Sequence, residues 1–160
     1  MREKKLVIDK ELLEEYKIYY KKSHPTSRNH PLAKPNAKNK TEGYIFGISI
    51  NEFTNIKNRI VQNNLKQNWK SFFVWLANKE GITGWKLDKF EISYKWVFPT
   101  QMRHDSDNYI FFNKFVADGL SEAEVITDDC FGQMYLKLDC NKYVDKENPR
   151  VEIIIKELIN

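Results

Sequence analysis

Four aspartates in the second half of the chain have the spacing of a site for phosphoryl-transfer chemistry. Asp105 and Asp107 follow the helix breaker Pro99 at the end of an alternating apolar stretch, and Asp128 and Asp129 come after the next predicted helix. Two carboxylates two residues apart can converge on one cation if the backbone between them is extended. Either of the later aspartates would complete a set of carboxylate oxygens suited to Mg²⁺ or Mn²⁺, hard cations that keep several waters.

A lysine shares the predicted helix with these acids. Asp107, Lys114 and Asp118 are separated by seven and four residues, which brings them to within roughly 40° of one helix face. An ammonium group near a scissile phosphate would neutralise charge in the transition state. The alternatives are that Lys114 pairs with a neighbouring acid and that Asp107 or Ser106 caps the helix.

Other sites built on Asp-x-Asp fit less well. An EF-hand loop that begins at Asp105 would need Gly at its sixth position and Glu at its twelfth, where the chain has Ile110 and Val116. An aspartyl-phosphate phosphatase or a sugar-nucleotide transferase is expected on a longer chain with a parallel sheet. The order of predicted elements argues against both.

Charge is distributed unevenly along the chain. Between Tyr16 and Lys40 there are seven basic and no acidic residues, whereas between Asp105 and Asp129 there are seven acidic residues and one lysine. A protein that binds a polyanion needs such cations, and carboxylates near the same phosphates would repel them unless a divalent metal lies between. This asymmetry favours metal-dependent chemistry on a phosphodiester.

Composition bounds the remaining possibilities. With 160 residues, 41% hydrophobic and 30% charged, the chain has the composition of one globular domain and not that of a disordered protein. We expect a cytoplasmic protein, because no stretch has the apolar length of a signal peptide or of a membrane span. Cys130 and Cys140 form neither a disulfide framework nor a set of zinc ligands.

Hydrophobic periodicity predicts the elements that position these residues. We expect an α+β domain, a small mixed sheet with helices packed on one face. In chain order the predictions are a helix running into a strand over 12–22, an irregular basic loop over 23–43, a helix over 51–78, a strand over 87–98, a helix over 107–120, and strands over 132–139 and 150–158.

Three motifs before the last two predicted strands form one pattern: Asp105-x-Asp107-Asn108, Lys114-x-x-x-Asp118-Gly119-Leu120 and Val125-Ile126-x-Asp128-Asp129. The pattern resembles the RusA family of Holliday junction resolvases, which is common in prophages. The resemblance covers Leu87 to Leu158, and more loosely Pro25-x-Ser27-x-Asn29. It implies a homodimeric α+β endonuclease that binds four-way DNA junctions and uses Mg²⁺ to cut two opposing strands, with a role in recombination and repair.

The resemblance also assigns residues. It implies Asp105, Asp107 and Asp129 as metal ligands, for Mg²⁺ or Mn²⁺ in its place, and Lys114 as the catalytic lysine. The interval between Asn108 and Lys114 is longer than is usual in the family, which indicates an extra turn or a bulge. Residues 1–15 are expected to extend a single domain that spans residues 1–160. The residues expected to contact DNA phosphates are Arg28, Lys34, Lys38, Lys40, Arg103 and His104.

Two other functions remain open. A protein that binds branched DNA without cutting it would result if the displaced Lys114 cannot reach the scissile phosphate. A metal-dependent phosphohydrolase acting on small phosphates would use the same acids. The basic loop favours the resolvase, because its surface is too large for a small substrate.

Overall fold

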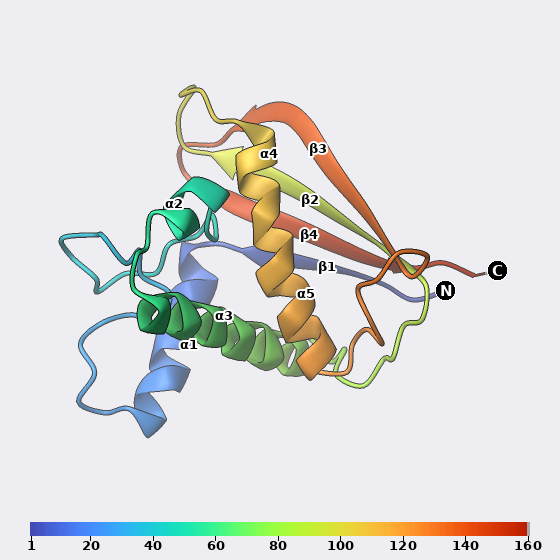
Figure 1. Ribbon diagram of the computed structural model, residues 1–160, viewed down its shortest axis with the longest axis horizontal. Coiled ribbons are helices and arrows are strands. Elements are labelled where there is room, and N and C mark those ends of the chain that lie inside the picture. The colour runs from blue at the N-terminus through green and yellow to red at the C-terminus, as the bar shows by residue number, and fades with distance from the viewer. Residues whose placement is uncertain (160) are drawn as a thin grey trace.

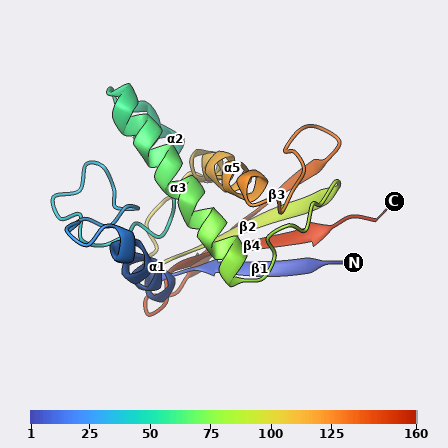
Figure 2. The same cartoon turned by 90° about the horizontal axis from the view of Figure 1, so that it is seen from below.

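The computed structural model, which describes residues 1–159, has one layer of strands and one layer of helices (Figure 1). In chain order the elements are β1 (Glu3–Ile8), α1 (Lys10–Ser23), α2 (Ile50–Thr54), α3 (Arg59–Lys79), β2 (Phe90–Phe98), α4 (Ser106–Tyr109), the 3-10 helix η1 (Ile110–Phe112), α5 (Asn113–Glu122), β3 (Met134–Val144) and β4 (Arg150–Glu157). The strands form one mixed sheet in the order β1-β4-β2-β3. The helices α3 and α5 pack on one face of this sheet (Figure 2), which confirms the predicted α+β fold.

Strand β2 lies between two partners and sets the directions of the sheet. Its alternating residues, among them Ile92 and Tyr94, are buried under the helices. It pairs antiparallel with β4, where Tyr94 lies opposite Ile153, and parallel with β3, where Tyr94 lies opposite Leu138. A parallel pair needs a crossover connection, which α4, η1 and α5 supply. The start of α4 therefore follows the carboxyl end of β2, and the chain returns to the opposite end before β3.

The crossing of α3 and α5 is close because a glycine lies at the contact. A Cβ atom added to Gly119 would lie 2.4 Å from Cβ of Phe73, so only glycine allows this approach. Trp69, Phe73, Phe112 and Phe115 form a group of neighbouring rings around the crossing. This packing holds α5, and with it Lys114, over the sheet.

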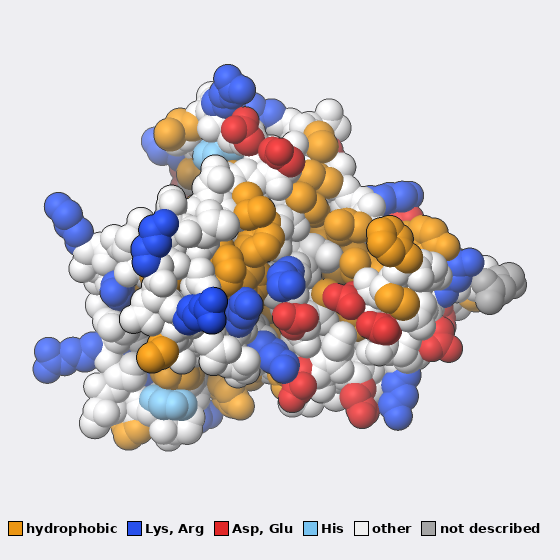
Figure 3. Space-filling model, in the orientation of Figure 1, with side chains coloured by type: hydrophobic (Ala, Val, Ile, Leu, Met, Phe, Trp, Pro, Cys, Tyr) orange, Lys and Arg blue, Asp and Glu red, His pale blue; other side chains and the backbone are white. Residues whose placement is uncertain are grey.

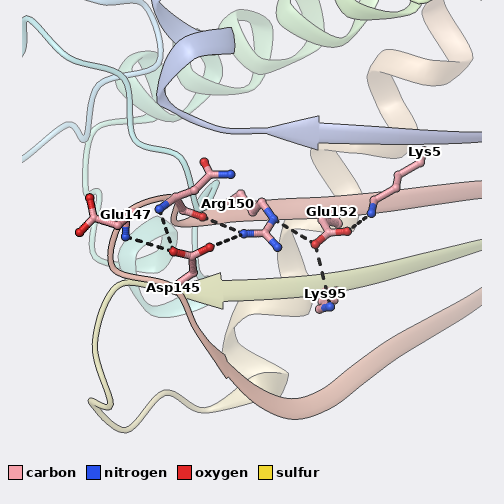
Figure 4. A network of polar contacts seen from close by, with 7 residues as sticks. Lys5, Lys95, Asp145, Glu147, Arg150 and Glu152 are labelled. Atoms are coloured by element: carbon pink, nitrogen blue, oxygen red, sulfur yellow. Dashed lines mark hydrogen bonds and ion pairs between the residues drawn. The ribbon is translucent and has the colours of Figure 1, made fainter.

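The face of the sheet opposite the helices carries a network of charges (Figure 4). The buried carboxylate of Glu152 pairs with Lys5 and Lys95, and accepts a hydrogen bond of 3.1 Å from Nε of Arg150. Arg150 also contacts Asp145 at 3.1 Å. Burial opposes ionisation of Glu152, yet these cations together lower its pKa. The network joins β1, β4, β2 and the turn that precedes β4.

The N-terminal half differs from the sequence predictions in three ways. The strand expected at the end of 12–22 is wrong, because α1 continues to Ser23 with His24 as its C-cap. The helix expected over 51–78 is two helices, since the chain leaves the helix after Thr54 and restarts at Arg59. Residues 1–15, for which no strand was predicted, contain β1, an edge strand paired with β4.

Candidate active site

Asp105 and Asp107 lie where the chain passes from the carboxyl end of β2 into α4. Asp105 is the N-cap residue, yet its side chain makes no capping hydrogen bond, and Asp107 follows in the first turn. Both residues are exposed. Among residues 1–159, the Asp105 carboxylate has one partner, Nε of Arg103 at 3.6 Å, and such an exposed ion pair stabilises little. Neither Asp107 nor Ser106 is the N-cap, and Asp105 makes no capping hydrogen bond. The helix therefore leaves the carboxylates of Asp105 and Asp107 available to a ligand.

The next residue, Asn108, has a structural partner. Its Oδ1 accepts a hydrogen bond of 3.1 Å from the backbone N–H of Asn51, in the first turn of α2. Ser49 caps α2 with its hydroxyl oxygen, which accepts from the N–H of Glu52. The Asp-x-Asp-Asn motif therefore combines two exposed carboxylates with an amide that holds α2 beside them through a hydrogen bond.

Lys114 is exposed in the first turn of α5, next to the buried Asn113. The structure has the 3-10 helix Ile110–Phe112 between Asn108 and Lys114, where the sequence indicated an extra turn or a bulge. Each of the three residues of the 3-10 helix turns the chain by about 120° about the helix axis, instead of the 100° of an α-helix. Lys114 therefore lies roughly 60° further around the axis than it would after a regular α-helix. Within residues 1–159 Lys114 forms no ion pair, not even with Asp118, so the structural alternative of a salt bridge is wrong.

The two adjacent aspartates after α5 have different surroundings. Oδ1 of Asp128 accepts a hydrogen bond of 2.8 Å from the backbone N–H of Asp129, which is turn chemistry. The Asp129 carboxylate is exposed and has no hydrogen-bond or ion-pair partner among the described residues. Of the pair, Asp129 is therefore the one whose oxygens are free for a ligand.

The sheet places Asp129 far from the first two acids along the strand direction. Ile126 forms a parallel bridge with Leu87, before the start of β2, whereas Asp105 follows the end of β2. A strand the length of β2 spans roughly 30 Å. No three His, Cys, Asp or Glu residues in the part of the chain that the structure describes lie close enough together to hold a metal ion. The carboxylates have the chemistry of Mg²⁺ ligands, but one chain does not assemble three of them.

A cavity lies beside Asp105, and no motif in the sequence predicted it. It has a volume of about 250 Å³ and lies between the end of β2, residues 102–109 and the middle of β3. The ring of His104 stacks on that of Phe98, with centroids 3.8 Å apart, and Nδ1 of His104 lies 3.1 Å from the hydroxyl oxygen of Tyr109. Burial, and then the charge of Lys142, lower the pKa of His104. His104 thus contributes to the wall of an aromatic cavity next to the acids.

The basic residues of the irregular loop are not equivalent. Arg28 and Lys38 are exposed. Nζ of Lys34 pairs with Glu52 at 3.1 Å and lies 4.3 Å from the centroid of the Tyr44 ring, so its charge is balanced within the chain. Lys and Arg side chains spread over the part of the surface formed by this loop, α2 and the start of α3, while Asp and Glu side chains lie beside α5 and the loop after it (Figure 3). The charge asymmetry of the sequence is therefore also spatial.

Buried His30 anchors the loop that carries these cations. Its Nδ1 accepts a hydrogen bond of 3.0 Å from the N–H of Leu32, and its Nε2 lies 2.8 Å from the carbonyl oxygen of Leu13 on α1. Burial lowers the pKa of His30. This histidine holds the loop as a neutral ring, a role the sequence did not indicate.

The sequence model of one protein family, described as endodeoxyribonuclease RusA, matches residues 31–156. The match includes the three candidate ligands and Lys114. No curated protein matches the chain. None of the helices within residues 1–159 has the length and apolar character needed to cross a membrane.

Proposed function

Because the chain belongs to the RusA family of endodeoxyribonucleases, we propose that it is a Mg²⁺-dependent, structure-selective nuclease that resolves four-way DNA junctions by cutting two opposing strands. The family match over residues 31–156 carries this proposal. The exposed carboxylates of Asp105, Asp107 and Asp129 support it. Within residues 1–159, Asp107 and Asp129 have no side-chain partner and Asp105 has only the exposed ion pair with Arg103, whereas a structural role would give these acids firmer partners. The expected cellular roles are recombination and repair in the cytoplasm, with a prophage as the source of the gene.

The proposed chemistry assigns a separate task to each group. Carboxylates repel a phosphodiester unless a cation lies between them, so the free acids are suited to hold the divalent metal on which the family depends. Within residues 1–159, one chain does not bring three of them together. Lys114 is assigned to the non-bridging oxygens of the scissile phosphate, where its unpaired ammonium balances charge in the transition state.

The cationic surface is assigned to the DNA backbone. Arg28 and Lys38 project from the irregular loop, and Lys40 and Lys34 lie less exposed in the same segment. Neutralising phosphates releases condensed counterions and makes affinity depend strongly on salt. Arg103 and His104 are assigned to phosphates next to the cut, since both lie beside Asp105.

The deciding experiment is cleavage of an end-labelled four-way junction, with a linear duplex of the same sequence for comparison. Wild type should nick the junction symmetrically in Mg²⁺ and not in EDTA, and Asp107→Asn should abolish cutting without loss of binding. Glu147→Gln is the matched control, because its exposed carboxylate lies in the turn before β4 and has no assigned role. Its cleavage should equal that of wild type.

Two results would replace the proposal. Binding without cutting in Mg²⁺ or Mn²⁺ would identify a non-catalytic protein that recognises branched DNA. No binding and no cutting, together with hydrolysis of a chromogenic phosphodiester that junction DNA does not inhibit, would identify a phosphohydrolase for small phosphates.

A further inference from the structure

The cavity beside Asp105 has no task in the chemistry assigned so far to the acids and to Lys114. It lies between the end of β2, residues 102–109 and the middle of β3, and it has a volume of about 250 Å³. Sites for drug-sized ligands have roughly 300–1,000 Å³. The cavity therefore has room for one small ring system, and it has no room for a protein helix or a duplex.

The walls of the cavity are aromatic. Trp96 and Phe98 come from the end of β2, and Tyr109 is the last residue of α4. The ring centroid of Tyr109 lies 6.0 Å from that of Trp96 and 5.4 Å from that of Phe98. His104 stacks on Phe98 and lies within hydrogen-bond distance of the Tyr109 hydroxyl. These mutual contacts fix the rings before a ligand binds, so a planar ligand would meet a preorganised stacking surface.

Two exposed cations, Arg103 and Lys142, also line the cavity. The Arg103 side chain is 92% exposed. Nζ of Lys142 donates a hydrogen bond to the carbonyl oxygen of Gln101, which joins β3 to the loop after β2. The acid that lines the cavity, Asp139, accepts a hydrogen bond of 2.7 Å from the Tyr143 hydroxyl. An aromatic cavity with cations at its mouth suits a nucleotide, whose base is flat and whose phosphates are anionic.

The cavity is continuous with the segment that carries the first two acids. Ser106 lines the cavity, and it lies in the chain between Asp105 and Asp107. Figure 3 shows basic, acidic and hydrophobic side chains side by side over the start of α4. A DNA strand with a phosphate at these acids would therefore have a neighbouring base within reach of the cavity.

A base that is stacked in a duplex cannot enter such a cavity. Proteins that bind a single base in a pocket must first turn it out of the stack, and this costs least where pairing is already weak or interrupted. At the branch point of a four-way junction the strands exchange partners, so bases there are the easiest to unstack. A pocket for one base therefore favours the branch over a linear duplex.

We propose that the cavity binds one unstacked nucleobase of the strand that is cut, next to the scissile phosphate, with Arg103 and Lys142 on the flanking phosphates. Stacking on Trp96, Phe98 and Tyr109 offsets the cost of unstacking and holds the strand in position beside the acids. The inference rests on the proposed function for the identity of the strand. It adds a source of selectivity for branched DNA that is separate from the cationic loop.

Alkylation of Cys140 tests the cavity without any cleavage. Cys140 lines the cavity and is exposed, whereas the exposed Cys130 does not line it. In EDTA, at least one of the four deoxynucleoside bisphosphates, which carry a phosphate on each side of the sugar, should slow the reaction of Cys140 with N-ethylmaleimide. At about ten times the dissociation constant the rate should fall roughly tenfold, because only the empty protein reacts. Cys130 should react at an unchanged rate.

The matched control ligand is the same sugar bisphosphate without a base. It keeps both phosphates for Arg103 and Lys142, but it should protect Cys140 far less at the same concentration, because it has nothing to stack on the rings. Peptide mass spectrometry reads both cysteines in one sample. Equal protection by ligands with and without a base would identify a site for phosphate only and overturn the inference. Absence of protection by all four nucleotides would overturn it as well.

A cavity-filling variant tests the role of the base in cutting. Cys140→Trp places an indole in the cavity, whereas Tyr135→Trp places one on the same strand outside it, since Tyr135 is 43% exposed and does not line the cavity. Both should have the circular dichroism of wild type. Single-turnover cleavage of a four-way junction should be about 5–150-fold slower in Cys140→Trp, the loss expected for one base stack, and unchanged in Tyr135→Trp. Equal rates of the two variants would overturn the inference.

Abasic junctions identify the nucleotide that enters the cavity. A residue without a base is placed in turn at each position beside the mapped cut. Removal of one particular base should change the cleavage rate of wild type, and the same removal should have no effect in Cys140→Trp, because the cavity is already filled. Equal effects in the two proteins at every position would contradict the proposal.

The two kinds of experiment separate this inference from the proposed function. Alkylation uses the wild-type protein without metal, so it decides whether the cavity binds a base even if wild type cuts no junction. In that case the nuclease assignment fails, and protection by nucleotides still supports the base site. A wild type that cuts junctions but gains no protection from nucleotides would overturn the inference and leave the nuclease assignment intact.

Discussion

Tyr94 and Asn113 join the middle of β2 to the first residue of α5 through a hydrogen bond of 2.6 Å, in which the tyrosine hydroxyl donates to Oδ1 of the amide. Both side chains are buried. Nδ2 of Asn113 also lies 3.7 Å from Sδ of Met134 at the start of β3. One amide therefore fixes the position of α5 over two parallel strands, and Lys114 is the next residue.

Removing the Tyr94 hydroxyl should destabilise the protein. In Tyr94→Phe the buried Oδ1 of Asn113 loses its donor, which costs about 1–3 kcal/mol. Urea denaturation of the two proteins measures the difference. Tyr135→Phe is the control, because its exposed hydroxyl can hydrogen-bond to water, and its stability should match that of wild type. Equal stability of Tyr94→Phe and wild type would contradict the importance of this bond.

Loss of the Lys114 ammonium should slow cutting more than it weakens binding. We expect Lys114→Ala to reduce the single-turnover cleavage rate of a four-way junction by about 10²–10³-fold, the usual effect of removing one transition-state contact. Lys114→Arg should recover part of the rate, because it keeps the charge at a different reach. An unchanged rate in Lys114→Ala would show that the 3-10 helix has turned this residue away from the reaction.

Gly119→Ala should destabilise the crossing of α3 and α5. The added methyl group would lie 2.4 Å from Cβ of Phe73, and overpacking of this kind costs about 1–3 kcal/mol. Ser121→Ala on the same helix serves as the control for helix propensity. Thermal unfolding should show a lower Tm for Gly119→Ala alone, and an unchanged or higher Tm would contradict the close approach.

Protonation of His30 should destabilise the protein in mild acid. Burial lowers the pKa of His30 in the folded state below its ordinary value near 6.5, so the unfolded state binds the proton more readily. Its contribution to stability is complete above about pH 6.5 and is lost as the pH falls toward the folded pKa. Protonated His30 would also lose the hydrogen bond from the N–H of Leu32, because its Nδ1 could no longer accept. Urea denaturation between pH 8 and 5 should show this loss in wild type and a smaller one in His30→Gln, and parallel profiles would contradict it.

The cations of the loop should differ in their share of DNA binding. Arg28→Ala and Lys38→Ala should each weaken junction binding and reduce the slope of log affinity against log salt by about 1. Lys34→Ala should change the slope less, because Glu52 already balances this charge at 3.1 Å. Fluorescence anisotropy at several salt concentrations measures the slopes. A slope change for Lys34→Ala equal to that for Lys38→Ala would show that the ion pair opens when DNA binds.

The sequence alone determined the features that depend on local side-chain pattern. Alternation from Phe90 to Phe98 predicted β2, because every second residue of a half-buried strand must be apolar. The spacing of Asp105, Asp107 and Lys114 indicated the chemistry and the family, and the longer interval before Lys114 indicated the irregularity that is the 3-10 helix. The order of these elements was sufficient for the α+β class.

Only the tertiary structure decided which residues lie together, because strand pairing joins segments that are far apart in the chain. Residues 3–8 became an edge strand by pairing with β4, and no local pattern in so short a segment predicted that strand. The parallel pairing of β2 with β3 separated Asp129 from Asp105 along the sheet, although their spacing in sequence suggested one cluster. Burial among distant elements likewise gave His30 and Asn113 their positions, since a polar side chain shows its partners only when the chain has folded around it.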